Sequence, residues 1–347
     1  MLKRTLLQTL LAGTALALSG AAFAQDAFDG PTTGPKAAEG KTIVVLAADM
    51  KNGGILGVTN GIEEAAAKIG WTVKVLDGAG SVQSRSAAVG QALALNPDGI
   101  VINGFDAAEQ AAALEGVTAA GIPMVSWHSG PKIGCDAPGG IFANVSTDAM
   151  QVSDVAAKWA IDDAGGKPGV VIFTDSTYQI AIDKADRMKK AIEDAGGTVL
   201  EYVDTPIAET STRMGPLTTT LLQKYGASWT HSLAINDLYF DFMGPSLAAA
   251  GIDGRGAPKA GSAGDGSEAA FQRIRTGQYQ AVTVAEPLNL QGWQLVDELN
   301  RAIQGEPCSG YITAPALVTE EGLKGTEGNA FDPNNGYREA YAAIWGK

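Results

Sequence analysis

Residues Thr42 to Gly70 read TIVVLAADMKNGGILGVTNGIEEAAAKIG. The run Ile43–Leu46 is apolar and rich in β-branched residues, which predicts a short strand that is buried on both faces. A polar turn follows at Asp49–Gly54, and apolar residues then recur at helical spacing as far as Ile69. A strand, a polar turn and a helix make half of a βαβ unit. Because ligands of open parallel sheets bind at the carboxyl ends of the strands, this turn is a candidate part of a site.

The same alternation of strand and helix continues through the rest of the chain. Further strands are predicted at 72–76, 99–102, 123–127, 141–143, 170–173, 198–203, 232–235, 258–261, 281–285 and 311–318. Further helices are predicted at 84–94, 107–120, 148–164, 179–195, 212–225, 238–250, 267–276, 288–304 and 336–345. Such alternation predicts parallel sheets with covered faces. Because the chain has 347 residues, enough for more than one core, the predicted fold class is α/β with two lobes.

The composition excludes several classes of partner. Acidic residues outnumber basic ones by 38 to 25, and the formal net charge is −13. An acidic surface is repelled by phosphate backbones and by anionic headgroups, so no nucleic-acid or membrane-surface partner is expected. After the N-terminal segment, no stretch approaches the roughly 18 consecutive apolar residues that a membrane-spanning helix needs.

The first residues have the features of an export signal. Lys3 and Arg4 precede an apolar stretch from Leu6 to Leu18, and Ala22-Phe23-Ala24 fits a cleavage site. We therefore interpret residues 1–24 as a cleaved signal peptide, and an N-terminal membrane anchor is the alternative. Residues 25–40 are rich in Pro, Gly, Thr and Ala and are predicted to form a flexible leader.

The chain has two cysteines, Cys135 and Cys308. In an exported protein an even number of cysteines favours a disulfide, and two free buried thiols are the alternative. The histidines, His128 and His231, have no Cys or His at ligand spacing, so no metal site is predicted.

Motifs for catalysis or for a cofactor are not evident in the sequence. Asp77-Gly78-Ala79-Gly80 resembles part of a dinucleotide fingerprint, but it lacks the third glycine and follows the second strand. There is no G-x-S-x-G elbow and no Walker loop. No cofactor is therefore expected, and an α/β enzyme is the weaker functional alternative.

Polar and aromatic side chains gather where the predicted strands end. They are Asn52, Asn103, Phe105, Trp127 and His128 in the first half of the chain, and Tyr178, Asn236, Tyr239 and Asp265 in the second half. Amide and carboxylate groups together with flat aromatic faces suit a neutral polyhydroxylated ligand. Asn and Asp are also common helix caps and turn formers, so each of these residues has a purely structural alternative.

Several segments, taken in order, resemble one family. They are NPDGIVIN at 96–103, GIPMV at 121–125, AIND at 234–237, AGDG at 263–266 and VAEP at 284–287. From Lys41 to about Val318 the chain resembles the periplasmic binding proteins of sugar ABC transporters, of the type I, ribose-binding kind. The resemblance implies two Rossmann-like lobes joined by a three-strand hinge. The first lobe would comprise residues 41–144 and 287–313, and the second residues 145–286 and 314–347.

The resemblance also implies a set of ligand-binding residues. They are Asn52, Asn103 and His128 in the first lobe, and Lys184, Glu209, Asn236, Asp265 and Ala285 in the second, with Glu286 beside the last. Relatives place two aromatic residues where this chain has Gly54-Ile55. Phe105, Trp127, Tyr178 and Tyr239 are the candidates to replace these rings. Gly53-Gly54 is expected to leave open space that sets the ligand preference.

By the same resemblance the chain is expected to be a monomeric periplasmic receptor and not an enzyme. It would bind a monosaccharide or polyol in the cleft and present it to an ABC permease in the inner membrane. Lys184, Glu209 and Glu286 are unusual for a plain sugar. They leave open, as alternative ligands, a charged or nitrogenous solute or a furanone-type signal molecule.

Overall fold

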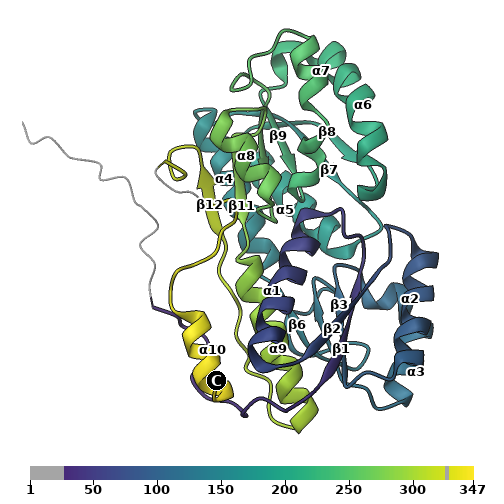
Figure 1. The fold of residues 1–347 in the computed structure, drawn as a ribbon. Coiled ribbons are helices and arrows are strands. Elements are labelled where there is room, and N and C mark those ends of the chain that lie inside the picture. The colour runs from purple at the N-terminus through teal and green to yellow at the C-terminus, as the bar shows by residue number, and fades with distance from the viewer. Residues whose placement is uncertain (1–26, 325–327) are drawn as a thin grey trace, which may run out of the picture.

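The structure, a computed structural model, describes residues 27–324 and 328–347 and has two α/β lobes (Figure 1). Each lobe is built on a six-stranded sheet, so the predicted fold class is confirmed. The predicted signal peptide at residues 1–24 lies outside the described residues. Within the described ranges, no helix combines the length and the apolar character needed to cross a bilayer.

The first sheet has the strand order β2-β1-β3-β4-β6-β5. Its strands are β1 (Thr42–Ala47), β2 (Thr72–Asp77), β3 (Gly99–Asn103), β4 (Met124–Trp127), β5 (Gly134–Ala137) and β6 (Ile141–Val145). All neighbouring strands are parallel except β5, which runs antiparallel to β6. The sequence analysis did not predict β5, because its sequence GCDA has few residues that favour strands and its pairing depends on β6.

The helices of the first lobe cover both faces of this sheet. They are α1 (Gly53–Ile69), α2 (Val82–Leu95), α3 (Ala111–Ala119) after the short η1 (Ala107–Gln110), α9 (Leu288–Gln304) and α10 (Tyr337–Trp345). α1 packs closely against α9, although more than 200 residues separate them. At this crossing a Cβ atom on Gly61 would lie 2.5 Å from the carbonyl oxygen of Asn289. Only glycine therefore fits at this position, and the helix backbones touch.

The second sheet has the order β12-β11-β10-β9-β7-β8. Its strands are β7 (Gly169–Thr174), β8 (Thr198–Asp204), β9 (His231–Ala234), β10 (Lys259–Ser262), β11 (Val282–Ala285) and β12 (Ala316–Thr319), of which β12 is antiparallel to β11. Its α-helices are α4 (Ala149–Asp163), α5 (Gln179–Asp194), α6 (Thr210–Tyr225), α7 (Gly244–Ala249) and α8 (Glu268–Thr276). Short 3₁₀ turns are η2 (Ile207–Glu209), η3 (Gly226–Ser228) and η4 (Asp237–Asp241). The helix predicted over 238–250 is thus divided into η4 and α7, and the strand predicted over 311–318 is shorter and begins later.

The chain passes between the lobes from β6 to α4, from β11 to α9, and from α9 to β12. The last helix, α10, then returns to the first lobe and lies beside α9 (Figure 1). Trp345 stacks on Trp293 of α9 with ring centroids 5.4 Å apart. The assignment of all of residues 314–347 to the second lobe is therefore wrong for α10. An amphipathic helix at the end of the chain does not reveal in its own sequence which lobe it covers.

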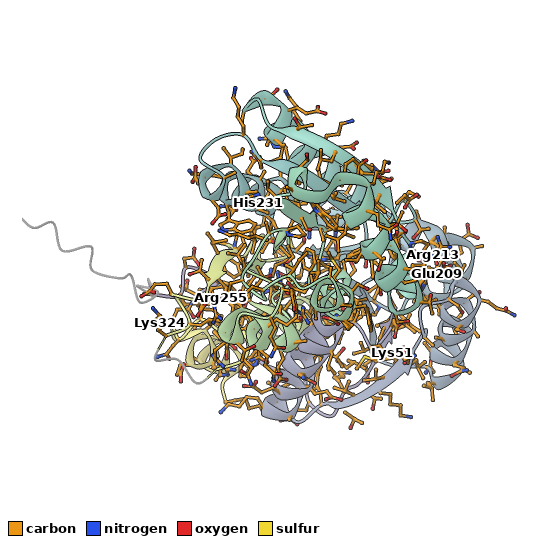
Figure 2. All side chains as sticks on the ribbon, turned by 90° about the horizontal axis from the view of Figure 1, so that it is seen from above. Lys51, Glu209, Arg213, His231, Arg255 and Lys324 are labelled. Carbon is orange, nitrogen blue, oxygen red and sulfur yellow. A yellow bond between two sulfur atoms is a disulfide. The ribbon has the colours of Figure 1, made fainter. Side chains whose placement is uncertain are left out.

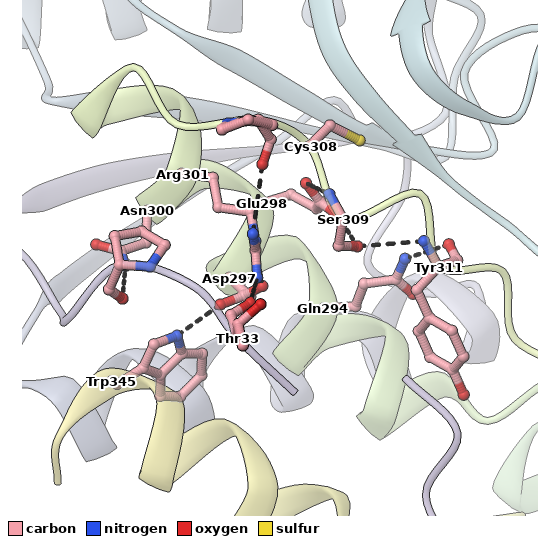
Figure 3. A network of polar contacts seen from close by, with 12 residues as sticks. Thr33, Gln294, Asp297, Glu298, Asn300, Arg301, Cys308, Ser309, Tyr311 and Trp345 are labelled. Atoms are coloured by element: carbon pink, nitrogen blue, oxygen red, sulfur yellow. Dashed lines mark hydrogen bonds and ion pairs between the residues drawn. The ribbon is translucent and has the colours of Figure 1, made fainter. Parts of the chain in front are cut away.

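The leader is docked on α9 and α10, so the prediction that it is flexible is wrong for its described part (Figure 3). Arg301 donates a hydrogen bond to the carbonyl oxygen of Thr33 at 2.6 Å. The buried amide of Asn300 donates to the carbonyl groups of Pro35 and Lys36. Pro- and Gly-rich composition indicates an irregular backbone, but these long-range partners on α9 hold the segment in place.

Removing the leader tests this docking. Deletion of residues 25–38 is expected to lower the free energy of unfolding by about 2–4 kcal/mol, because the buried polar side chains of Asn300 and Arg301 lose their partners. Urea denaturation of the two chains measures the difference. A chain that lacks only residues 25–27 keeps these hydrogen bonds and is the control. A loss below about 0.5 kcal/mol for the longer deletion would show that the segment is not held.

Cys135 and Cys308 form a disulfide with an S–S distance of 2.09 Å, which confirms the predicted bridge. The bond joins β5 to the segment that follows α9. Next to it, Ser309 donates backbone and side-chain hydrogen bonds to Glu298 of α9 (Figure 3). The segment that leads into the third crossing is therefore held from two sides.

Candidate functional site

A cavity lies between the lobes, at the carboxyl ends of strands from both sheets. Its volume is about 80 Å³, measured as the space open to the centres of water-sized molecules. One water needs roughly 10–15 Å³ on this measure, so the cavity has room for a small solute. Its polar lining consists of Asp49, Asn52 and His128 from the first lobe and Tyr178, Lys184, Asn236 and Asp265 from the second.

Asn52 stands at the start of α1, where it caps the helix and also lines the cavity. Its Oδ1 accepts hydrogen bonds from the backbone N–H groups of Gly54 at 2.9 Å and Ile55 at 3.2 Å, which caps the helix. Its Nδ2 makes no hydrogen bond within the described residues and is left for a ligand. Capping therefore orients this side chain without using up its donor.

The glycine pair that follows Asn52 brings the lobes together. A Cβ atom on Gly53 would lie 2.5 Å from Cβ of Ser267, and one on Gly54 would lie 2.4 Å from Oδ2 of Asp265. The expectation that Gly53-Gly54 leaves space for ligand is therefore wrong, because second-lobe side chains fill that space. The pair permits close approach of the lobes, and the neighbouring Ile55 lines the cavity.

The loop after β4 presents Trp127 and His128. Their rings stack with centroids 3.8 Å apart and an interplanar angle of 10°. Asn144 of β6 supports the loop, since its Oδ1 accepts from the N–H of Ser129 and its Nδ2 donates to the carbonyl oxygen of Gly130. His128, at φ 51°, is thereby turned so that its Nε2 lies 3.1 Å from Oε2 of Glu286.

The second-lobe wall presents Asn236 and Asp265, and the neighbouring Asp237 holds it in place. Oδ1 of Asn236 caps η4 through the N–H of Leu238 at 3.1 Å. Asp237 accepts hydrogen bonds from the N–H groups of Gly266 at 2.8 Å and Ser267 at 2.9 Å, which fixes the loop that carries Asp265. The side chain of Asp265 itself has no hydrogen bond or ion pair with any described residue.

Burial dominates the titration of Asp265. It raises the pKa of this carboxyl to about 8, although Lys184 opposes the shift, and the negative charges of Glu286 and Asp237 add to it. An unpaired carboxylate in this position is costly, so without a ligand the protonated form is favoured at neutral pH.

Lys184 and Tyr178 come from α5 and the residue that precedes it. Lys184 donates to the carbonyl oxygen of Ala263 at 2.9 Å and lies 3.7 Å from Oε1 of Glu286. Tyr178 packs against the hydrophobic cores of both lobes. Burial raises the pKa of its phenol, which keeps the group as a hydrogen-bond donor.

Glu286 links the crossings between the lobes. Its Oε2 accepts from Gln291 at 3.2 Å and from the N–H of Thr147 at 3.4 Å, in addition to the contact with His128. Gln291 also donates to Thr313 at 3.0 Å. Burial alone would raise the pKa of Glu286, but His128 and Lys184 outweigh it and hold this pKa well below its ordinary value. The side chain is therefore a buried anion at the hinge.

Of the predicted site residues, Asn52, Trp127, His128, Tyr178, Lys184, Asn236 and Asp265 line the cavity. Glu286 lies behind the wall, at the hinge. Asn103 donates instead to Ile55 and Thr59 of α1, which ties β3 to the helix. Phe105 is buried in the first core, where the guanidinium of Arg85 is 5.7 Å from its ring centroid.

Glu209 and Tyr239 also lie outside the cavity, and so does Ala285, which is buried in the core beside α8. Glu209 is exposed and pairs with Arg213 one helical turn away, as the labelled side chains in Figure 2 show. Tyr239 is fully buried, and its hydroxyl donates to the carbonyl oxygen of Thr205 at 2.9 Å. In both cases an ion pair or a hydrogen bond within the second lobe holds the side chain away from the cavity.

The sequence analysis did not select the apolar part of the lining. It consists of Ile55, Ile180, Ile207 and Ile235 with Ala48, Ala181 and Ala208. Ile55 and Ile235 directly follow strand-end segments, so their positions in the sequence could have indicated that they line the cavity. No such feature of the sequence marks Ile180 and Ile207, since an isoleucine near the start of a helix is more often a core residue.

His128, Asp265 and Glu286 offer ligand atoms that lie within 4.8 Å of one another, a spacing that a metal ion could use. The ammonium of Lys184 is 3.7 Å from the same Glu286 carboxylate. A metal ion held by all three groups would lie close to this ammonium and be repelled at short range. We therefore assign Glu286, with Lys184 and His128, to charge compensation within the protein, whereas Asp265 has no ion-pair partner among the described residues.

Comparison with known proteins identifies the fold. A family model described as a periplasmic binding protein domain matches residues 43–307. An ABC transporter solute binding protein from Agrobacterium vitis with bound allitol is 20% identical, with coverage of 81% of this chain and 96% of that chain and a TM-score of 0.70. A second one from Agrobacterium vitis, bound with α-D-tagatopyranose, is 16% identical, with coverage of 82% and 97% and a TM-score of 0.72.

A glucose-galactose binding protein from Geobacillus stearothermophilus is 18% identical, with coverage of 83% of this chain and 100% of that chain and a TM-score of 0.70. No curated protein sequence matches the chain. Identities at this level support a common fold. The family model spans more than half of the chain and agrees with the two lobes and the cavity between them. The chain therefore belongs to the periplasmic binding protein family, whose members bind solutes and do not transform them.

Proposed function

We propose that this protein is the solute receptor of an ABC importer and that it binds a monosaccharide or polyol in the interlobe cavity. The observation that carries the proposal is that hydrogen-bonding side chains of both lobes face one small cavity. The ligands named for the structural relatives, allitol and α-D-tagatopyranose, support this class of solute.

Closure of the lobes would couple binding to transport. Asn52 and Asn236 can contact the same ligand only when the lobes are together, so the ligand stabilises the closed state. The hinge would lie at the crossings near residues 144–147, 286–287 and 313–316. An ABC permease in the inner membrane would then recognise the closed receptor.

The remaining parts of the proposal come from the sequence. Residues 1–24 would direct the chain to the periplasm and be removed there. A monomer is the expected state of a receptor that shuttles to a permease. The acidic surface makes nucleic acid an unsuitable partner.

The ligand class is tested by a thermal-shift screen of the mature protein against sugars, polyols, sugar acids and amines. A true ligand at about 100 times its Kd should raise the midpoint by about 5 °C.

The second candidate, a charged or nitrogenous solute, is favoured by one observation, the unpaired carboxyl of Asp265 in the lining. The sugar or polyol reading fails if no neutral or amino-substituted sugar or polyol raises the midpoint.

Replacement of Asn236 by serine tests the site itself. Serine also caps helices, so the substitution keeps the cap on η4 but removes the Nδ2 donor. We expect the Kd measured by calorimetry to rise about tenfold, as for the loss of one buried hydrogen bond. Asn335 caps the backbone N–H of Tyr337 far from the cavity, so Asn335→Ser is the matched control. If Asn236→Ser binds the solute as tightly as Asn335→Ser does, Asn236 is not part of the site.

A further inference from the structure

Acidic side chains outnumber basic ones at the cavity. Asp49 and Asp265 line it, and Glu286 lies directly behind the wall. Lys184 is the one lysine or arginine among the described residues of the lining. Three acidic side chains thus lie in or behind the lining with one ammonium group, and the His128 ring contacts Glu286.

The ammonium of Lys184 is already engaged away from Asp265. It donates to the carbonyl oxygen of Ala263 at 2.9 Å, and its nearest carboxylate oxygen is Oε1 of Glu286 at 3.7 Å. His128 contacts the other oxygen of Glu286. The available cationic groups therefore compensate Glu286 and leave Asp265 without a partner.

Asp265 is buried, with 7% of its surface exposed, and it lines the cavity. The side-chain carboxyl group accepts no hydrogen bond from any described residue. A buried carboxylate without a partner either takes up a proton or acquires a cation from outside. Burial raises the pKa of this group to about 8, so deprotonation becomes favourable once a positive charge arrives.

The rest of the wall limits the size and polarity of the ligand. Ile55, Ile180, Ile207 and Ile235 contribute to its apolar surface. The polar groups of the lining beside Asn52, Asn236 and Asp265 are Asp49, His128, Tyr178 and Lys184. A ligand that fits is compact, has an apolar side, and directs a donor toward Asp265.

We propose that the solute of this receptor carries a protonated nitrogen that binds the carboxylate of Asp265, as in an amino sugar or an amino polyol. This inference rests on the proposed function, because it takes the interlobe cavity as the solute site. An ammonium group forms a charge-assisted hydrogen bond with a carboxylate, and such bonds are about twice as strong as neutral ones. A hydroxyl in the same place gives only the neutral donor.

Matched pairs of probes that differ by one hydroxyl or ammonium group test the inference. The mature protein is titrated in a calorimeter at pH 7 with D-galactose and D-galactosamine, and with sorbitol and 1-amino-1-deoxysorbitol. We expect the amine of at least one pair to bind about tenfold more tightly than its hydroxyl partner. Asp265→Asn keeps the shape but removes the charge, and it should reduce this ratio to near one.

Glu209→Gln is the matched control, because it removes an exposed carboxylate outside the cavity and should leave the ratio unchanged. Equal or tighter binding of both hydroxyl members overturns the inference and leaves the proposed function standing. An unchanged preference for the amine in Asp265→Asn also overturns it. If neither member of either pair binds, the inference is overturned, and the thermal-shift screen decides whether the sugar or polyol class stands. If Asp265→Asn does not fold, the comparison in the wild-type protein decides.

Discussion

Replacement of Gly54 by alanine is expected to weaken solute binding at least tenfold without destabilising the unliganded protein. The new Cβ atom would lie 2.4 Å from Oδ2 and 2.8 Å from Cβ of Asp265 when the lobes are together. Contacts this short cannot persist, so Asp265 must move or the lobes must stay apart. Gly54 lies in the first turn of α1, and alanine favours a helix more than glycine does. The open form is therefore unaffected or slightly more stable.

Calorimetry with a solute found in the thermal-shift screen measures the affinity, and urea denaturation measures the stability. Gly90→Ala is the matched control, because Gly90 also lies in a helix and a Cβ atom there would meet no atom within 4 Å. It should add about 0.5–1 kcal/mol to the stability and leave the Kd unchanged. If Gly54→Ala binds as tightly as Gly90→Ala, the glycine pair is not what permits closure.

Replacement of Glu286 by glutamine is expected to lower the free energy of unfolding by about 3–5 kcal/mol, the usual effect of removing one partner from a buried ion pair. The carboxylate is fully buried and contacts His128 at 3.1 Å and Lys184 at 3.7 Å. Glutamine has a similar shape but leaves the ammonium of Lys184 without its anion. Urea denaturation at pH 7 measures the change, and a loss under 1 kcal/mol would contradict this account of the hinge.

The double variant Lys184→Met with Glu286→Gln separates charge pairing from shape. If the two groups interact, the double variant loses less stability than the sum of the two single losses. The pH dependence gives a further check. Because the pKa of Glu286 is lower in the folded state, its contribution is present above the ordinary value of 4.5 and is lost as the pH falls below it. The difference between wild type and Glu286→Gln should therefore shrink in acid.

The unpaired carboxyl group of Asp265 links these experiments. Gly54 places the first lobe against Asp265, and Glu286 takes up the cationic groups that could otherwise neutralise it. A solute that supplies the missing positive charge would be bound most strongly in the closed state. Ligand preference in this protein would then depend on the unpaired carboxyl group of Asp265 more than on stacking rings.

Local sequence was sufficient to predict the strand, the polar turn and the helix between Thr42 and Gly70. The side-chain period, the cap at Asn52 and the left-handed residue at Gly70 are set by neighbours within a few positions. The same holds for the α/β class, because alternating strands and helices have few ways to pack. The order of segments AIND and AGDG likewise indicated the second-lobe wall with Asn236 and Asp265.

Contacts between distant segments decided the rest. Asn52 and Asn103 both follow strands, yet only Asn52 lines the cavity, because α1 offers partners that consume the amide of Asn103. The sequence Gly53-Gly54 predicts open space, but Asp265 and Ser267 of the other lobe fill it. The positions of the leader and of α10 could not be predicted from local sequence, because their partners lie on α9, far away in the chain. A single sequence encodes which groups need partners, whereas packing determines which partner each group meets.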